Sequence, residues 1–399
     1  FFLRERGATG MAPRAIPVAA LAALLIGVAW LYGDAAFFRS WEATHSECPA
    51  CELCETHGQA NALGARVTQV EHGTPAQVWA GVSVGPMKDL AVAMTLESVV
   101  NPPRQDSDFR GRHIDVLSDP SNLFIPRCKH AGKLISDGKY VVQHNGIVVK
   151  SDGYNSAKFS TIFQTNAGIH EPAEERIHGL FISKMPRNAV MIELGCYWSW
   201  FSIWFNKEVE DARNYGIEAE AWRMAIGQQH FKLNNATAVN FTHSKVGTDH
   251  LSVKAYIAQH SIEYVNLLHM DIQGFEGEVM QDLVPLLQAR KIGYIIISTH
   301  SPTVHAECSK ILAEHGHRIV ASANPKDETF MMDGMVAAVP PSVSEEEIPM
   351  MDMGMRKHTP LRTSMYPGLI SDDDCPHLPL WARNDPGLSK PRNSELIPA

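Results

Sequence analysis

The sequence has no excess of positive charge. Its 35 Lys and Arg residues stand against 44 Asp and Glu residues, which gives a formal net charge of -9. A protein that holds nucleic acid through general electrostatics needs a basic surface, so the composition argues against a nucleic-acid partner. Internal repeats are also missing, which argues against a solenoid or a propeller. With 45% hydrophobic and 20% charged residues in 399, the chain has the composition of a globular protein of one or two domains.

Charged residues are absent from 15–33, "AIPVAALAALLIGVAWLYG", and three arginines precede this stretch in the flank 1–14. About 20 apolar residues span a bilayer, and the apolar part of a signal peptide has about 7–15. We therefore predict a transmembrane anchor or a signal segment over 15–33. Arginines on its N-terminal side predict a single-pass membrane protein with the main domain lumenal, in the secretory pathway, where Asn235 and Asn240 would be glycosylation acceptors. Secretion after signal cleavage is the alternative.

Cysteine is scarce, and three of the seven lie close together at Cys48, Cys51 and Cys54. With His45 and His57, ligand-type residues recur here at every third position. A zinc site normally needs a second pair of ligands further along, and the other four cysteines are scattered. We predict local or intermolecular disulfides at this cluster, with a zinc site as the second interpretation. Nothing in the spacing elsewhere demands a metal, so no metal site is predicted.

Regular patterning begins near residue 140. The stretch "KYVVQHNGIVVKSDGY" alternates around "HNG" and predicts a β-hairpin. From about Glu174 onward, apolar strands alternate with amphipathic helices up to "DGMVAAVP", which predicts a doubly wound α/β sheet. We therefore expect a cysteine-containing stem or extension over 34–140, the sheet domain over 141–340, and an extension rich in proline and acidic residues over 341–399.

Polar residues end several of the predicted strands. In an open parallel sheet, ligands bind at the carboxyl ends of the strands, near the point where the strand order reverses. The candidates for such a crevice are Glu193 and Gly195 after the first strand, Glu218 after the second, Asp271 and Gln273 after the fourth, and His300 after the fifth.

The turn "ELGCYWS" contains a single glycine. Gly195 lets the backbone approach a ligand closely, and the following helix offers free N–H groups near Tyr197. A dinucleotide fingerprint requires three glycines, so this turn argues against a nicotinamide-dependent oxidoreductase. Glu193 suits a ligand with an ammonium group, such as S-adenosylmethionine, and Glu218 suits ribose hydroxyls. A carboxylate satisfied by helix N-terminal amides is the alternative for Glu193.

Three stretches, "GIHEPAEERIHGLFISKMPRNAVMIELGCYWSWFSIWFN", "HMDIQGFEGEVM" and "IIISTHSP", together resemble the FkbM-type S-adenosylmethionine-dependent methyltransferases. The resemblance runs from about 144 to 339. It implies a class I methyltransferase fold, which is Rossmann-like, with a seven-stranded sheet, helices on both faces and an antiparallel last strand. It also implies S-adenosylmethionine as the cofactor and O-methylation of a hydroxyl on a glycan or other small acceptor.

The sequence departs from this family at two places. Ala219 and Glu220 follow Glu218 where relatives commonly show a proline, and Trp198 and Ser199 stand in the glycine-rich turn. Loss of cofactor binding with retention of the fold would produce such departures. A non-catalytic binding protein is therefore the alternative function.

Methyl transfer requires alignment of a nucleophilic oxygen with the methyl group, and it uses a base for the hydroxyl proton. We predict His300, with a reference pKa of about 6.5, as that base, and Asp271 as a second catalytic residue that orients the acceptor or holds the ligand ammonium. In "HEPAEE", His170, Glu171 and Glu175 are predicted to bind substrate, because the helical spacing would put both carboxylates on one face. A strand-end bystander is the alternative for His300, and a solvated helix face for the two glutamates.

Overall fold

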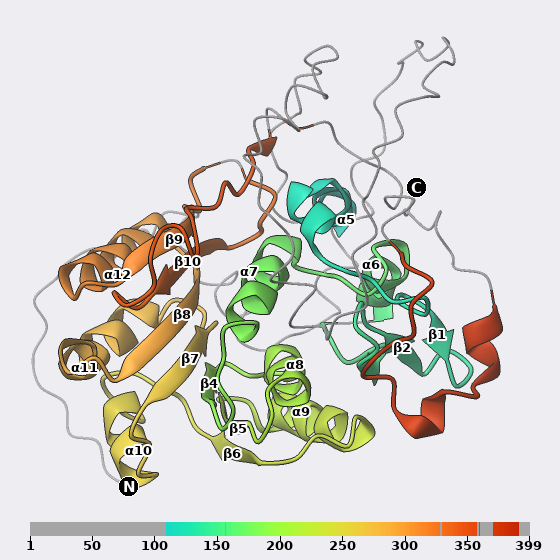
Figure 1. Cartoon of the computed structure of the whole chain (residues 1–399), viewed down its shortest axis with the longest axis horizontal. Helices are drawn as coiled ribbons and strands as arrows, with labels where there is room; N and C mark the ends of the chain where they lie inside the picture. Colours follow the sequence, from blue (N-terminus) through green and yellow to red (C-terminus); the bar gives the residue numbers. More distant parts are fainter. Residues whose placement is uncertain (1–108, 156, 328, 357–358, 360–369, 391–399) are drawn as a thin grey trace, which may run out of the picture. The chain divides into compact units, whose positions relative to one another are not determined.

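The computed structural model describes residues 109–155, 157–327, 329–356, 359 and 370–390, drawn in colour in Figure 1. These residues belong to one compact unit, Gln69–Ala399. The segment 15–33 and the cluster of Cys48, Cys51 and Cys54 lie outside the described residues.

A seven-stranded sheet forms the centre of this unit. Its strands are β4 (Val190–Leu194), β5 (Arg213–Glu218), β6 (Val239–His243), β7 (Val265–Met270), β8 (Ile292–Thr299), β9 (Arg318–Ala323) and β10 (Gly334–Val339). They lie in the order β6-β5-β4-β7-β8-β10-β9. The strands from β6 to β8 are parallel, whereas β10 runs antiparallel to both β8 and β9. This order and this antiparallel last strand confirm the predicted class I methyltransferase fold.

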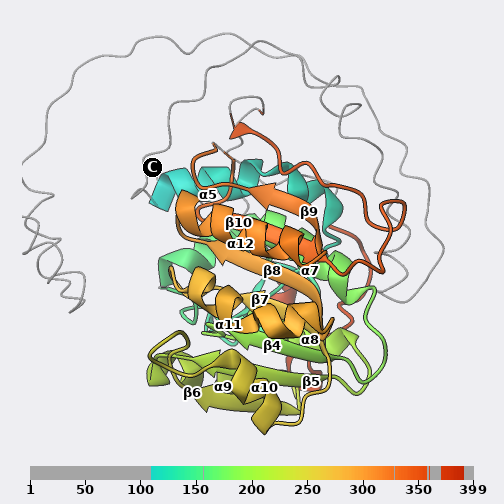
Figure 2. The same ribbon diagram turned by 90° about the vertical axis from the view of Figure 1, so that its left-hand side faces the viewer.

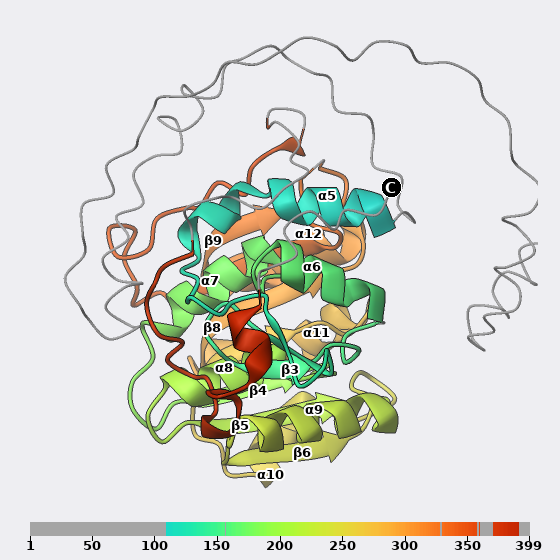
Figure 3. The same cartoon turned by 90° about the vertical axis from the view of Figure 1, so that its right-hand side faces the viewer.

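Helices cover both faces of the sheet. In Figures 1 and 3, α7 (Pro172–Ile182), α8 (Trp200–Glu208) and α9 (Ala221–Leu233) lie on one face. Figure 2 shows α10 (Val253–Gln259), α11 (Glu276–Gln288) and α12 (Pro302–Glu314) on the other face. Alternate strand residues belong to different cores, because side chains leave a strand on opposite sides. Met191 packs in the core that includes α7 and α8, and Ile192 packs in the core that includes α10 to α12.

The lengths of the described helices can be compared with the length that a membrane-spanning helix needs. The longest of them, α9, α11 and α12, have 13 residues each, whereas a helix needs about 20 to cross a bilayer. No helix in the described ranges is long and apolar enough to span a membrane. The prediction of a single-pass membrane protein is therefore wrong for this part of the chain.

A smaller layer precedes the sheet in the sequence. It contains α5 (Phe109–Ser118), η1 (Pro120–Phe124), η2 (Ala157–Phe159), α6 (Ser160–Thr165) and a three-stranded antiparallel sheet of β1 (Leu134–Ile135), β2 (Tyr140–Val142) and β3 (Val148–Lys150). The β2–β3 pair confirms the predicted hairpin. Asn234, which follows α9, accepts a hydrogen bond from the Val148 amide and donates one to the Val148 carbonyl, so this layer is attached to the main sheet.

The C-terminal segment returns to this smaller layer, where it forms η4 (Leu380–Ala382) and η5 (Pro386–Ser389) beside β1 and β2 (Figure 1). A disulfide joins Cys128 to Cys375 across 247 positions of sequence. Asp385 also accepts hydrogen bonds from the amide and hydroxyl of Ser136. In the sequence these two cysteines are scattered, because a pair so distant has no local spacing that marks it.

Candidate functional site

The turn after β4 has a left-handed backbone at three positions. Gly195, Tyr197 and Ser199 have φ values of +77°, +37° and +60°. A Cβ at position 195 would lie 1.8 Å from the carbonyl oxygen of Asp271. Gly195 is therefore required where the turn after β4 touches the backbone that follows β7. Helix α8 begins at Trp200 rather than at Tyr197 as its sequence suggests, since the positive φ values interrupt the helix.

Glu218 ends β5 next to this turn. Its Oε2 accepts the amide hydrogen of Tyr197 and its Oε1 accepts that of Glu220, each at 2.9 Å. The carboxylate therefore fixes the turn after β4 against the turn after β5. Close by, Trp222 is 56% exposed, and its ring centre lies 5.9 Å from that of Tyr197. Trp222, an exposed aromatic residue near the carboxyl end of β5, was not among the residues predicted from the sequence.

Glu193 lies in the core instead of the crevice. Its Oε2 accepts the amide hydrogen of Ser202 in the first turn of α8 at 3.2 Å, and its Oε1 is 3.7 Å from Nδ1 of His269. Burial raises the pKa of Glu193 to about 7. The arrangement matches the alternative of a carboxylate satisfied by a helix N-terminus, and it differs from the predicted contact with a ligand ammonium. The physical reason is the alternation of side chains along a strand. Glu193 lies two residues after Met191, on the same face of β4, and Met191 packs in the core.

Asp271, Gln273 and His300 form one cluster at the ends of β7 and β8. The Nε2 of Gln273 lies 2.9 Å from Oδ1 of Asp271 and 2.7 Å from Nε2 of His300. His300 also lies 3.3 Å from Asp271 and 2.8 Å from Oε1 of Glu276, and Asp333 is 3.9 Å away. Although partial burial opposes the charge, hydrogen bonds to Asp271 and Glu276 raise the pKa of His300 to about 10.

The raised pKa of His300 argues against its predicted role as a general base and favours the alternative of a strand-end residue. A histidine with a pKa of about 10 carries its proton at neutral pH and cannot accept another. In this structure His300 lies between Asp271 and Glu276, and both carboxylates favour the charged form of its ring.

Replacing His300 with glutamine should lower stability in a pH-dependent way. The pKa of His300 in the folded state lies above the unfolded value of about 6.5, so its contribution is complete below pH 6.5 and lost as the pH rises through about 10. After allowance for solvent screening we expect a loss of about 2 kcal/mol at pH 6. Urea unfolding of both proteins at pH 6, 8 and 10 measures this. A difference that stays constant with pH would contradict the assignment.

Glu171 and Glu175, which were predicted to share a helix face, have different hydrogen-bond partners. Glu175 is fully buried, and its Oε1 accepts the amide hydrogens of His170 and Glu171 at 2.9 and 3.1 Å. Glu171 instead accepts a hydrogen bond from Arg112 at 3.0 Å and from the Tyr154 hydroxyl at 3.3 Å. The predicted shared face is wrong, because α7 begins after Glu171, whose φ of -133° and ψ of 73° are not helical.

His170 lies between these glutamates, with Nδ1 2.8 Å from Glu175 and Nε2 3.4 Å from Glu171. Burial opposes its charge, but the two carboxylates raise the pKa of His170 to about 9. Arg112 and His170 thus compensate Glu171, whose pKa falls to about 2 even though burial acts in the opposite direction. Of the three residues predicted to bind substrate, His170 and Glu171 line a pocket. Glu175 does not line it, but it accepts hydrogen bonds from the backbone amides of the other two.

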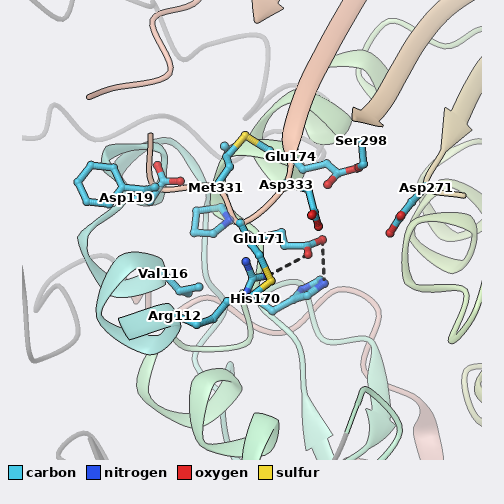
Figure 4. Close-up of a pocket in the computed structure, with 14 residues that line it drawn as sticks. Arg112, Val116, Asp119, His170, Glu171, Glu174, Asp271, Ser298, Met331 and Asp333 are labelled. Atoms are coloured by element: carbon cyan, nitrogen blue, oxygen red, sulfur yellow. Dashed lines mark hydrogen bonds and ion pairs between the residues drawn. The ribbon is translucent and has the colours of Figure 1, made fainter. Parts of the chain in front are cut away.

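Figure 4 shows this pocket, which opens between α5, α7 and the ends of the sheet. It is lined by Arg112, Val116, Asp119, His170, Glu171, Pro172, Ala173, Glu174, Asp271, Ser298, Phe330, Met331, Met332 and Asp333. Asp271 belongs both to the pocket and to the segment that touches Gly195. The pocket is therefore adjacent to the turn after β4. Sequence analysis missed Arg112 and Asp333, which lie outside the motifs, and it assigned no role to Glu174.

Comparison with known proteins gave structural similarities only. No protein-family model and no curated protein matches the chain. Precorrin-6y C5,15-methyltransferase from Geobacter metallireducens is similar over 41% of this chain and 87% of its own, with 14% identity and a TM-score of 0.31. Magnesium protoporphyrin IX methyltransferase from Synechocystis PCC 6803 with bound S-adenosylmethionine is similar over 47% and 84%, with 15% identity and a TM-score of 0.32.

A putative S-adenosylmethionine-dependent methyltransferase from Streptococcus mutans is similar over 50% of this chain and 55% of its own, with 15% identity and a TM-score of 0.36. All three TM-scores are below 0.5. The assignment of the fold therefore rests on the order and direction of the seven strands.

Proposed function

We propose that this protein is an S-adenosylmethionine-dependent methyltransferase that O-methylates a hydroxyl group of a glycan or another small polyhydroxylated acceptor. The observation that carries the proposal is the pocket beside the Gly195 turn, at the carboxyl ends of the parallel strands. The strand order reverses at β4, and ligands of such sheets bind at that point.

The residues around the turn fit the cofactor. Glu218 has lone pairs left for ribose hydroxyls after it accepts two amide hydrogens. Asp271, with Gln273 beside it, offers a partly exposed carboxylate to an ammonium group. Trp222 offers a flat apolar surface for the adenine, next to Tyr197. When bound, S-adenosylmethionine supplies an electrophilic methyl carbon on a sulfonium.

The residues that line the pocket suit a polyhydroxylated acceptor. Hydroxyl groups donate hydrogen bonds to carboxylates such as Asp271 and Asp333, and they accept them from a cation such as Arg112. Phe330 and Met331 add an apolar wall against which the C–H face of a sugar ring can pack. The resemblance of the sequence motifs to the FkbM-type methyltransferases supports the same acceptor class.

Two other functions are less consistent with the geometry. In dinucleotide-binding sheets the order is 3-2-1-4-5-6 and the strands are mostly parallel, whereas here the antiparallel β10 lies between β8 and β9. The non-catalytic alternative has one observation in its favour. Both oxygens of Glu218 already accept amide hydrogens, so this carboxylate also has a purely structural role.

A transfer assay tests the proposal. The full chain is incubated with S-adenosylmethionine labelled in its methyl group and with a panel of mono- and oligosaccharides, and label in the acceptor is counted. We expect transfer to at least one acceptor and at least a hundredfold loss in Asp271→Asn, roughly 3 kcal/mol of the barrier. Binding of S-adenosylhomocysteine without transfer to any hydroxyl acceptor would contradict O-methylation, and no binding by the folded chain would favour the non-catalytic alternative.

A further inference from the structure

Three ionisable side chains form a buried line behind the pocket. Glu174 comes from α7, His269 from β7 and Glu193 from β4, and none of them is more than 4% exposed. The Nε2 of His269 lies 2.6 Å from Oε1 of Glu174, and its Nδ1 lies 3.7 Å from Oε1 of Glu193. A buried charge needs an opposite charge beside it. Here the imidazole lies between the two carboxylates, so each charged group has a neighbour of opposite sign.

Glu174 is the member of this line that reaches the pocket. Both hydrogen bonds of the Glu174 carboxylate are made by its Oε1. One is to Nε2 of His269, and the other is accepted from the hydroxyl of Ser298 at 3.1 Å. Its Oε2 accepts no hydrogen bond from any of the residues that the structure describes, although Glu174 is only 4% exposed and lines the cavity. Figure 4 shows the Glu174 carboxylate beside Ser298 at the wall of the pocket. An uncommitted oxygen on a buried carboxylate is a ready acceptor for a proton from a bound ligand.

The other carboxylates of the pocket have partners of their own or are accessible to water. Burial raises the pKa of Asp119 to about 6, but its Oδ1 accepts the amide hydrogen of Ser121 at 2.7 Å, which caps η1. Glu171 is compensated by Arg112 and His170, and Asp271 is held by His300 and Gln273. Asp333 is 39% exposed in its side chain and is therefore accessible to water. Burial raises the pKa of Glu174, while the hydrogen bond from His269 opposes this rise. Burial thus makes Glu174 a stronger base than an exposed carboxylate.

We propose that Glu174 is the general base that removes the proton from the acceptor hydroxyl, and that His269 is the positioning residue that orients it. This inference rests on the proposed methyltransferase function. The O–H bond of the acceptor breaks and its proton moves to Oε2 of Glu174. The acceptor oxygen forms a bond to the methyl carbon, and the C–S bond breaks with its electron pair moving to sulfur. Glu193 compensates the charge of His269 from the far side, and the proton leaves Glu174 through the pocket opening.

Sinefungin tests this inference without knowledge of the acceptor. In this cofactor analogue an amine-bearing carbon replaces the methylsulfonium, so its ammonium group takes the position of the methyl group and points to the place from which the acceptor oxygen attacks. A carboxylate base at that place should make the wild-type chain bind sinefungin more tightly than S-adenosylhomocysteine. A charge-assisted hydrogen bond corresponds to roughly a 10- to 100-fold preference. Calorimetry of the full chain with each ligand gives the two dissociation constants.

Glu174→Gln should abolish this preference while the affinity for S-adenosylhomocysteine stays within about twofold, since a neutral amide cannot pair with the ammonium. Glu174→Asp keeps the charge and should retain part of the preference, which covers the case that the glutamine variant fails to fold. His269→Gln should weaken the preference for sinefungin without weakening S-adenosylhomocysteine, an effect that general unfolding would not produce. Asp333→Asn removes the charge of a second pocket carboxylate, and we expect it to reduce the preference less than Glu174→Gln does.

The outcomes separate the two proposals. Binding of both ligands with an unchanged preference in Glu174→Gln would overturn the assignment of the base and leave the methyltransferase intact. Loss of the preference in Asp333→Asn alone would overturn it as well, by moving the base to Asp333. Failure of the wild-type chain to bind S-adenosylhomocysteine would overturn the proposed function and this inference together.

Discussion

Replacing Gly195 with alanine should abolish binding of S-adenosylhomocysteine and destabilise the protein by about 3 kcal/mol. The new Cβ would lie 1.8 Å from the carbonyl oxygen of Asp271, and backbone atoms cannot move aside as the tip of a side chain can. The turn after β4 would have to separate from the segment after β7, which also carries Asp271 into the pocket. Calorimetry with the cofactor product and urea unfolding measure the two effects.

Gly138 provides the matched control. It lies between β1 and β2 with a φ of +84°, and beyond its two chain neighbours no residue has an atom within 4 Å of the position that its Cβ would take. Gly138→Ala therefore introduces the same backbone strain without the overlap, and we expect a cost of about 1 kcal/mol and unchanged binding. Binding by Gly195→Ala at the wild-type affinity would show that the two turns do not need this contact.

Removing the disulfide should have the second large effect. Cys128 and Cys375 close a loop across 247 positions, so the bond restricts the unfolded chain strongly. In the double variant Cys128→Ser with Cys375→Ser we expect a loss of about 2–5 kcal/mol, or a Tm lower by roughly 5–15 °C. Thermal unfolding followed by circular dichroism measures it.

A reducing agent supplies the control for this prediction. In its presence the wild-type chain and the double variant should have the same Tm, whereas without it the wild-type chain should have the higher Tm. The buried free thiols Cys196 and Cys308 are present in both proteins, so their chemistry cancels in the comparison. Equal stability of the oxidised wild-type chain and the double variant would contradict a structural role for the bond.

Much of the fold could be predicted from local patterns. The alternation of apolar strands and helices located each strand of the central sheet, and the hairpin of β2 and β3 followed from its turn signal. The antiparallel β10 was implied by the family resemblance, because no local pattern shows the direction of a strand. The short helix α10 between β6 and β7 was missed, since its seven residues give too few turns for a clear period.

The candidate site was harder to predict. Strand parity alone could have placed Glu193 on the core face, since Met191 is two positions before it on the same side of β4. Pro172 could have signalled that α7 starts after Glu171, so that Glu171 and Glu175 do not share a helix face. Arg112 and Asp333 reach the pocket only through tertiary packing of α5 and of the segment before β10, which no spacing in the sequence records.

Calorimetric titration of the full chain with S-adenosylhomocysteine tests the central claim most directly, with NAD⁺ titrated in parallel. The turn at Gly195, Glu218 and the exposed Trp222 predict one molecule of S-adenosylhomocysteine bound per chain and no binding of the dinucleotide. A folded chain that binds neither ligand, or that binds NAD⁺ instead, would contradict the methyltransferase account.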